Sequence, residues 1–156
     1  MAADKIDESA ILLDQQLCFM LYAASRAMTK AYQPMLKDLG ITYPQYLVLM
    51  VMWEWHQSGE EDRTVSALGQ RLMLDSGTLT PLLKRLEASG LLTRQRDEMD
   101  ERRVLLQLTE EGVALRAKAL VWVNEGREAM DEENGLSRES VAELREGLRG
   151  FLKKIS

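Results

Sequence analysis

The segment formed by residues 64–108 constrains the fold more than any other part of the chain. "TVSALGQRL" has the apolar spacing of a short helix, a tight connection "MLDSG" follows, and "TLTPLLKRLEASG" has the spacing of a second helix. Asp75 or Ser76 is placed to cap this second helix, and Gly90 to end it. The apolar positions that the two helices can share as one core are Leu68, Leu72, Leu79, Leu83 and Leu86. Two short helices joined in this way predict a helix-turn-helix.

The hydrophobic period changes directly after this pair of helices. "LLTRQR" (91–96) and "RRVLLQL" (102–108) alternate as strands do, and the acidic turn "DEMDE" (97–101) joins them. A two-stranded hairpin that follows a helix-turn-helix is a wing. Pro81 lies beyond the first turn of the second helix, so we expect it to remove one backbone hydrogen bond and to bend the helix axis.

Helical patterns flank this segment on its N-terminal side. Residues 11–39 carry apolar positions at spacings of three and four, which predicts a long helix that Pro34 bends or restarts and Gly40 ends. "TYPQ" then opens a helix through a capping box of Thr42 and Gln45. We expect this helix to end near Trp55, where a long acidic loop, "HQSGEEDR", begins. Four methionines are expected to fill the core: Met20, Met28, Met50 and Met52.

Two more helices are predicted on the C-terminal side, one from Thr109 to about Glu132 and one that Ser137 caps. The terminal helices carry more apolar surface than a small core needs, which favours a helical dimer interface. The predicted fold class is therefore mainly α with a small β wing. It is a winged helix-turn-helix whose N- and C-terminal helices form a dimerisation domain.

Charge is distributed unevenly along the chain. The net charge of −5 argues at first against a nucleic-acid partner. Residues 63–103 nevertheless hold eight Lys/Arg and six Asp/Glu, a balance of +2 that leaves −7 for the rest. A locally basic segment can bind phosphate, because only the facing charges release counterions. On charge alone, an ordinary solvated surface explains the segment better.

The compartment is predicted from what the sequence lacks. No run of 18 apolar residues and no apolar signal-peptide segment is present, and the single cysteine cannot form an internal disulfide. These features predict a reducing, cytoplasmic location without membrane contact. The only histidine, His56, cannot make a metal site alone, so we expect neither metal nor cofactor.

A recognition helix places the residues of its N-terminal part on base edges and nearby phosphates. Small hydroxyls followed by cations fit this use on the second helix: Ser76, Thr78, Thr80, Lys84 and Arg85. The wing carries Arg94, Arg96, Arg102 and Arg103, and a wing arginine can enter a narrow minor groove. Asp97, Asp100 and Glu101 can orient these arginines through ion pairs. The alternative is that all these charges are solvated wing residues.

Two stretches then resemble a known family. "LDSGTLTPLLKRLEASGLLTRQRDEMDERRVLLQLTEEG" resembles the MarR-type winged-helix regulators, including the wing pattern of Asp100, Arg102 and the later "LTEEG". "DQQLCFMLYAASRAMTKAYQPMLKDLGITYPQYLVLMVMWE" resembles the organic-hydroperoxide-sensing OhrR branch, and the resemblance covers about residues 12–120. It implies a homodimeric repressor on a pseudo-palindromic double-stranded DNA operator. It also implies that Arg102 enters the minor groove and that the hydroxyls and cations of the second helix read DNA.

The lone cysteine, Cys18, has two interpretations from the residues themselves. A cysteine in an apolar helix is most often an inert small hydrophobe, and no Lys, Arg or His lies within one helical turn of it. Tyr22, four residues on, shares its face. Tyr32 lies about 21 Å further along a straight helix, so it reaches Cys18 only if the helix folds back or a partner chain supplies it. An antiparallel partner would bring Tyr32 and Tyr43 close.

The resemblance implies the second interpretation, a redox-sensing Cys18 of the one-cysteine type. Tyr22 of the same chain and Tyr32 and Tyr43 of the other would then hydrogen-bond the thiolate. An organic hydroperoxide as inducer would give a sulfenic acid. A low-molecular-weight thiol would then form a mixed disulfide, or overoxidation would follow, and the operator would be released. Apolar neighbours would favour organic peroxides over hydrogen peroxide: Phe19, Met20 and Trp53.

The resemblance also suggests a division of labour along the chain. Residues 1–40 would hold the N-terminal dimerisation helix with the sensor cysteine, 41–110 the winged helix-turn-helix, and 111–156 the C-terminal dimerisation helices. One alternative is a MarR-type repressor released by a small aromatic ligand, with Cys18 incidental. Another is a thiol peroxidase. Such an enzyme would need an arginine and a hydroxyl beside the sulfur, but neither lies near Cys18 in the sequence, and the helix-turn-helix would be unexplained. We therefore predict that the chain is not an enzyme. A third is an architectural DNA-binding dimer without a switch.

Overall fold

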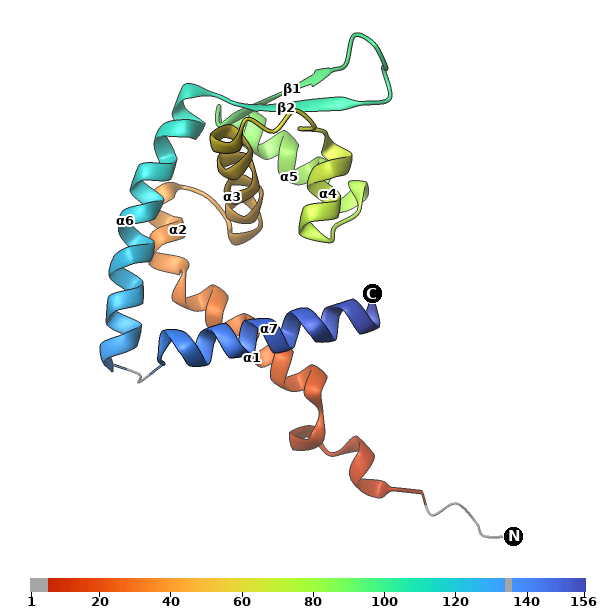
Figure 1. The fold of residues 1–156 in the computed structure, drawn as a ribbon, viewed down its shortest axis with the longest axis vertical. Helices are drawn as coiled ribbons and strands as arrows, with labels where there is room; N and C mark the ends of the chain where they lie inside the picture. The colour runs from red at the N-terminus through yellow and green to blue at the C-terminus, as the bar shows by residue number, and fades with distance from the viewer. Residues whose placement is uncertain (1–5, 134–135) are drawn as a thin grey trace. The chain divides into compact units, whose positions relative to one another are not determined.

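The structure is a computed structural model that describes residues 6–133 and 136–156. The chain divides into two compact units, Met1–Gly112 and Val113–Ser156. Figure 1 shows the order of the helices and the hairpin of strands. No helix within the described ranges has the length and apolar character needed to cross a membrane. The division predicted at residues 40 and 110 stays a prediction.

The N-terminal helical pattern is interrupted more than the sequence predicted. α1 covers Leu17–Ala31 and α2 covers Gln33–Leu39, and two 3-10 turns, Glu8–Ile11 and Leu13–Gln15, stand where the long helix was expected to begin. The restart is confirmed, since α2 carries its proline in the first turn, where a missing N–H costs no helical hydrogen bond. Gly40 ends α2 at a φ of +68°, as predicted.

α3, Tyr43–Ser58, forms the centre of the first unit. Its capping box is confirmed: the backbone N–H of Thr42 donates to Gln45 Oε1 at 2.9 Å, and the Gln45 N–H donates to Thr42 Oγ1 at 3.4 Å. The predicted end near Trp55 is wrong, because the helix continues to Ser58. His56 therefore lies exposed on the last helical turn rather than in a loop, and the acidic connection is shortened accordingly.

α4, Val65–Leu72, and α5, Ser76–Ala88, form the predicted helix-turn-helix. The turn is tight because Met73 adopts a left-handed conformation and because Gly69 has no side chain; a Cβ there would lie 2.7 Å from the Leu74 carbonyl oxygen. The predicted shared core is confirmed for all its leucines except Leu72, which is half-buried: Leu68, Leu79, Leu83 and Leu86 are almost fully buried. Pro81 lies inside α5.

The methionine prediction is mostly wrong. Met52 is buried beside the other core residues of α3, but Met20, Met28 and Met50 are exposed within the single chain. Two of these three lie on α1, which buries none of its residues. The apolar pattern of α1 is thus real, but its own chain leaves that face open.

The wing is an antiparallel hairpin of β1, Leu92–Arg96, and β2, Val104–Leu108. Leu92 stands opposite Leu108 at its base, and Arg96 stands opposite Val104 towards its tip. The second strand begins later than predicted, so Arg102 and Arg103 lie in the connecting loop, where they are free of the strand's alternation. The chain before α4 joins the same sheet: Thr64 bridges to Leu105, and the Leu106 N–H donates to the Arg63 carbonyl at 2.8 Å.

α6, Glu110–Glu133, begins in the first unit and continues through the second, where α7, Arg138–Ile155, follows. Both predicted caps are present: the Gly112 N–H donates to Thr109 Oγ1 at 3.1 Å, and the Ser140 N–H donates to Ser137 Oγ at 3.1 Å. No residue of α7 is buried, and its apolar stripe, which includes Leu144 and Ile155, is exposed.

Candidate nucleic-acid interface and sensor cysteine

The N-terminal part of α5 presents the predicted reading residues at the surface. The cap is Asp75, whose side chain accepts the Thr78 N–H at 2.7 Å. This bond, with others from Thr78 and Gly77, lowers the pKa of Asp75, so its carboxylate stays charged at the helix start. All five candidates on this helix are exposed: Ser76, Thr78, Thr80, Lys84 and Arg85. The Thr80 hydroxyl already donates to the Ser76 carbonyl at 2.7 Å, so it is partly committed to its own helix.

A groove of about 1090 Å³ runs beside α5, between α4 and the wing. Its floor is apolar and includes Leu79 and Leu83, and its rim carries hydroxyls and arginines. The groove therefore brings together four of the predicted DNA contacts, which come from α5, β1 and the wing loop: Ser76, Thr80, Arg94 and Arg102.

Arg94 differs from the other candidates because it holds β1 to α5. Its guanidinium lies 3.0 Å from Glu87 Oε1, and its backbone N–H donates to Glu87 Oε2 at 2.8 Å. The backbone bond, followed by the side-chain bonds and the charge of Arg94, lowers the pKa of Glu87. Both side chains are only partly exposed. This pairing gives Arg94 a structural task, and its contact with DNA stays a prediction.

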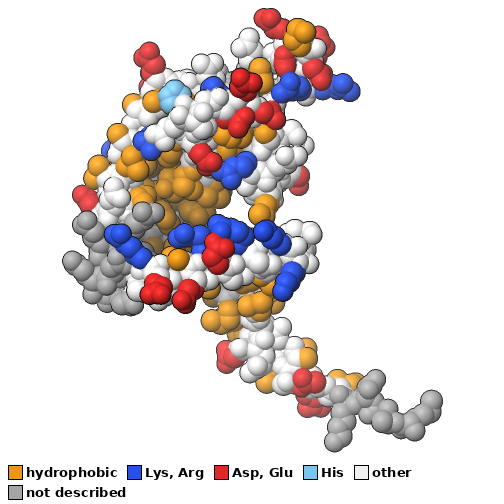
Figure 2. Space-filling view, viewed as in Figure 1, with side chains coloured by type: hydrophobic (Ala, Val, Ile, Leu, Met, Phe, Trp, Pro, Cys, Tyr) orange, Lys and Arg blue, Asp and Glu red, His pale blue; other side chains and the backbone are white. Residues whose placement is uncertain are grey.

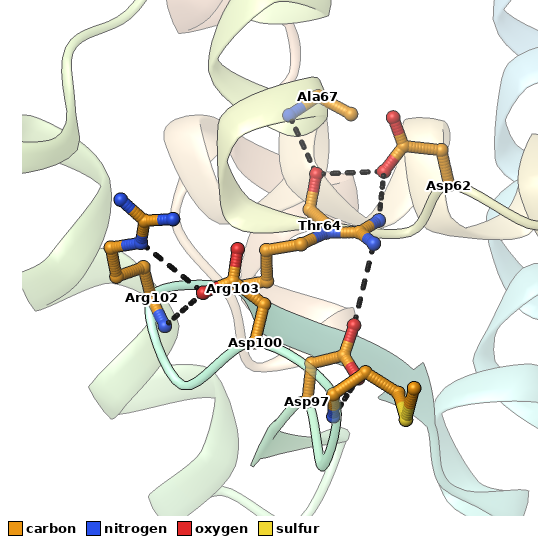
Figure 3. A network of polar contacts seen from close by, with 8 residues as sticks. Asp62, Thr64, Ala67, Asp97, Asp100, Arg102 and Arg103 are labelled. Carbon is orange, nitrogen blue, oxygen red and sulfur yellow. Dashed lines mark hydrogen bonds and ion pairs between the residues drawn. The ribbon is translucent and has the colours of Figure 1, made fainter.

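The arginines near the tip of the wing differ in the groups that they bind. Arg102 pairs with Asp100 at 3.2 Å, as predicted, yet its side chain is 91% exposed. Arg103 turns towards two carboxylates, Asp97 and Asp62 (Figure 3). Arg96 donates to the backbone carbonyl of Glu101 at 2.8 Å, not to its carboxylate. Figure 2 shows the resulting mixture of acidic and basic side chains over the tip of the wing.

Cys18 lies exposed in the first turn of α1. Among the described residues its thiol has no hydrogen-bond partner within its own chain. Tyr22 is also exposed, and its ring carries the Arg26 guanidinium at 5.5 Å from the centroid. The predicted contact between Tyr22 and the sulfur therefore stays a prediction. Within those same residues there is also no group of three His, Cys, Asp or Glu side chains able to hold a metal ion.

The other two predicted sensor residues meet within one chain. The rings of Tyr32 and Tyr43 lie 5.7 Å apart. Burial, and then the neighbouring Tyr32, raises the pKa of Tyr43, so its phenol remains a hydrogen-bond donor at neutral pH. Sequence reasoning missed Tyr46, whose buried ring lies 5.8 Å from Tyr32 and 6.4 Å from Tyr43. Its spacing of three from Tyr43 on one helix was the available signal.

Trp53 anchors this aromatic cluster to the core of the first unit. Its ring meets Tyr46 edge-on at 6.2 Å, and its Nε1–H donates to the Gly112 carbonyl at 2.7 Å. The side chain is buried. Trp53 is thus a packing residue, and its proposed place in an apolar pocket around Cys18 stays a prediction.

Comparison with known proteins supports the resemblance drawn from the sequence. The family described as "Transcriptional regulator SarA/Rot" matches residues 30–118. The organic hydroperoxide resistance transcriptional regulator of Bacillus subtilis (strain 168) is 57% identical over 108 residues, which cover 69% of this chain and 70% of that protein. The relatives are regulators, so the thiol peroxidase alternative is not supported and the chain is not an enzyme.

Solved structures agree on the whole fold. Reduced AbfR bound to DNA superposes with a TM-score of 0.75 at 35% identity, covering 95% of this chain and 97% of that one. Overoxidised AbfR bound to DNA gives a TM-score of 0.68 at 36% identity, covering 92% and 95%. AbfR is a protein of Staphylococcus epidermidis. The helix-turn-helix, the wing and these likenesses lead to one assignment: the chain belongs to the MarR/SarA-type winged-helix transcriptional regulators.

Proposed function

We propose that this regulator is a homodimeric repressor that senses organic hydroperoxides through Cys18 and then releases its DNA operator. The observation that carries the proposal is the joint presence of a complete helix-turn-helix and a single exposed cysteine on α1, away from its own chain's tyrosine cluster. The name of the Bacillus subtilis relative supplies the inducer class.

The DNA-binding part of the proposal places α5 in the major groove and the wing beside it. The exposed hydroxyls and cations of α5 would contact base edges and phosphates, and Arg102, exposed and oriented by Asp100, would enter the minor groove. Two such heads in one dimer fit a pseudo-palindromic operator with half-sites about 34 Å apart. Arg94 would assist from the base of the wing.

The dimer part of the proposal follows from unburied apolar helices. Leu17 and Met20 on α1 and Leu144 and Ile155 on α7 are each more than half exposed. Helices with such faces gain stability only when another surface covers them. A second copy of the chain would cover them and bring its own Tyr32 and Tyr43 to Cys18. Phenol donors, including the Tyr43 hydroxyl that stays protonated, would stabilise the thiolate there.

The chemistry starts from that thiolate. It attacks the terminal oxygen of the hydroperoxide, the O–O bond breaks, and the sulfur becomes a sulfenic acid, while the alkoxide leaves and takes a proton from water to become the organic alcohol. A low-molecular-weight thiol then attacks the sulfenic sulfur, giving a mixed disulfide and water. Overoxidised AbfR is found bound to DNA, so we infer that the bulk of the thiol adduct drives release rather than further oxidation of the sulfur. That adduct would separate the tyrosines from the cysteine and change the spacing of the two heads.

The test is DNA binding followed by fluorescence anisotropy. The probe is duplex DNA from upstream of the gene for this chain, titrated with cumene hydroperoxide in the presence of cysteine, with Cys18→Ser as the matched control. We expect the wild type to release the DNA, dithiothreitol to restore binding, and Cys18→Ser to stay bound. Equal release by both proteins, or release by neither, would overturn the role of Cys18 and direct the search to a small aromatic ligand.

A further inference from the structure

We propose that Arg103 anchors the wing and acts in DNA binding by positioning it, while the adjacent Arg102 makes the contact. The inference rests on the DNA-binding part of the proposed function and not on redox sensing. It starts from the different surroundings of two arginines that follow one another in the sequence (Figure 3).

The guanidinium of Arg103 forms ion pairs with two carboxylates. Its Nη1 lies 3.3 Å from Asp97 Oδ2, and its Nη2 lies 3.4 Å from Asp62 Oδ1. Its side chain is 47% exposed, about half the exposure of Arg102. A cation between two anions contributes little attraction for a phosphate, because the local sum of charge is negative.

The two carboxylates are themselves fixed. Asp97 begins the wing loop, where its Oδ1 accepts the Met99 N–H at 2.9 Å, and its side chain is only 15% exposed. Backbone bonds close the loop around it, since the Asp97 N–H donates to the Arg103 carbonyl at 2.9 Å. Arg103 therefore joins the two ends of the loop through both backbone and side chain.

Asp62 connects this loop to the helix-turn-helix. It accepts the Thr64 hydroxyl at 2.9 Å, and Thr64 in turn caps α4 by accepting the Ala67 N–H at 3.1 Å. Thr64 is buried and bridges to β2. The path from Arg103 through Asp62 to Thr64 thus ties the tip of the wing to the start of α4. A wing held in this way presents Arg102 to DNA at a fixed place relative to α5, which reduces the entropy lost on binding.

Substitutions in the acidic loop before α4 test the proposal, because electrostatic repulsion of phosphates and anchoring of the wing predict opposite changes in DNA affinity. Removing a carboxylate from a DNA-binding face normally tightens binding, because it removes repulsion of the phosphates. If Asp62 holds the anchor, Asp62→Asn instead weakens binding. The amide oxygen still accepts the Thr64 hydroxyl, so the cap of α4 is retained. Glu61→Gln is the matched control, since it makes the same chemical change on the same exposed loop and its carboxylate has no ion pair among the described residues.

Binding is measured by anisotropy on the upstream duplex, with circular dichroism melts to confirm folding. We expect Asp62→Asn to weaken binding by about threefold or more, Glu61→Gln to leave it unchanged or tighter, and Asp62→Asn to add nothing in an Arg103→Ala background. Tighter binding by Asp62→Asn in both backgrounds would overturn the anchor, because the Asp62 carboxylate would then act only by repelling phosphates, independently of Arg103.

A second measurement needs no DNA and so separates this inference from the proposed function. Hydrogen exchange of the reduced protein compares the Asp97 and Arg103 amides of the wing loop with the Tyr46 amide of α3, which donates to the Thr42 carbonyl at 2.9 Å. Arg103→Ala and Asp62→Asn should speed exchange in the wing and leave α3 unchanged. Unchanged wing exchange in both variants would refute the anchor even if DNA release behaves as proposed.

Discussion

The winged helix-turn-helix and the terminal helices use their apolar residues differently. Four leucines of α4 and α5 are almost fully buried, Leu68, Leu79, Leu83 and Leu86, whereas α1 and α7 bury none of their residues. The same periodicity of three and four describes both regions in the sequence. The difference indicates that the DNA-binding head completes its core within one chain, and that the terminal helices have faces suited to a second chain.

The largest expected effect is a loss of dimer affinity when a charged side chain replaces an apolar one on α7, which tests the difference between the two regions. Leu144 is 65% exposed, so Leu144→Lys should leave a monomer folded but place a cation in the proposed dimer interface. We expect the dimer dissociation constant to rise by about a hundredfold or more. Analytical ultracentrifugation over a concentration series measures it, with Glu143→Lys on the neighbouring position as control. An unchanged dimer would remove Leu144 from the interface.

A smaller effect, on the free energy of unfolding, is expected when either of two glycines of α6 is replaced by alanine. A Cβ at Gly112 would lie 2.0 Å from the Leu91 carbonyl oxygen, whereas nothing lies within 4 Å of one at Gly126. Gly112→Ala should therefore destabilise the first unit by about 1–3 kcal/mol. Gly126→Ala should stabilise its helix by up to about 1 kcal/mol. Urea denaturation measures both, and effects of the same sign would contradict the tight contact at the start of α6.

The smallest effect is expected on the pH dependence of stability, through the ion pair that joins α5 to β1. Hydrogen bonds from Arg94 lower the pKa of Glu87, so this pair stabilises the folded head above the unfolded-state pKa of glutamate, about 4.3. That stability is lost as the pH falls through the lowered pKa of the folded state. Glu87→Gln should flatten the decline of stability below about pH 4.5. Thermal melts at pH 3–7 measure the slope, and an unchanged acid limb would contradict the shift.

Much of the fold could be predicted because local patterns determine it. The capping box at Thr42, the caps at Asp75 and Ser137, and the alternation of the wing are all properties of neighbouring residues. The errors occur where local signals conflict with tertiary context. α3 continues past Trp55 to reach Gly59, and the second strand begins after Arg103 because side-chain pairing closes a wider loop.

The candidate sites could be predicted only in part, for a different reason. Residue type and helix position gave the exposed set on α5 and the pair Asp100–Arg102. They did not give Tyr46 in the aromatic cluster or Asp62 beside Arg103, because these contacts depend on how elements pack. Residue type alone did not distinguish Arg94 and Arg103 from Arg102, which only the family resemblance singled out, and their carboxylate partners in the structure show the difference.

The most direct test of the central claim asks whether two chains build the site around Cys18. A heterodimer is assembled from one Cys18→Ser chain and one Tyr43→Phe chain, so its only cysteine faces an intact Tyr43 if the tyrosine comes from the partner. The rate of sulfenic acid formation with cumene hydroperoxide is followed by mass spectrometry of a trapped adduct. We expect the heterodimer to react at the wild-type rate and the Tyr43→Phe homodimer to react more slowly. A heterodimer as slow as that homodimer, or a homodimer as fast as the wild type, would contradict a sensor site shared between two chains.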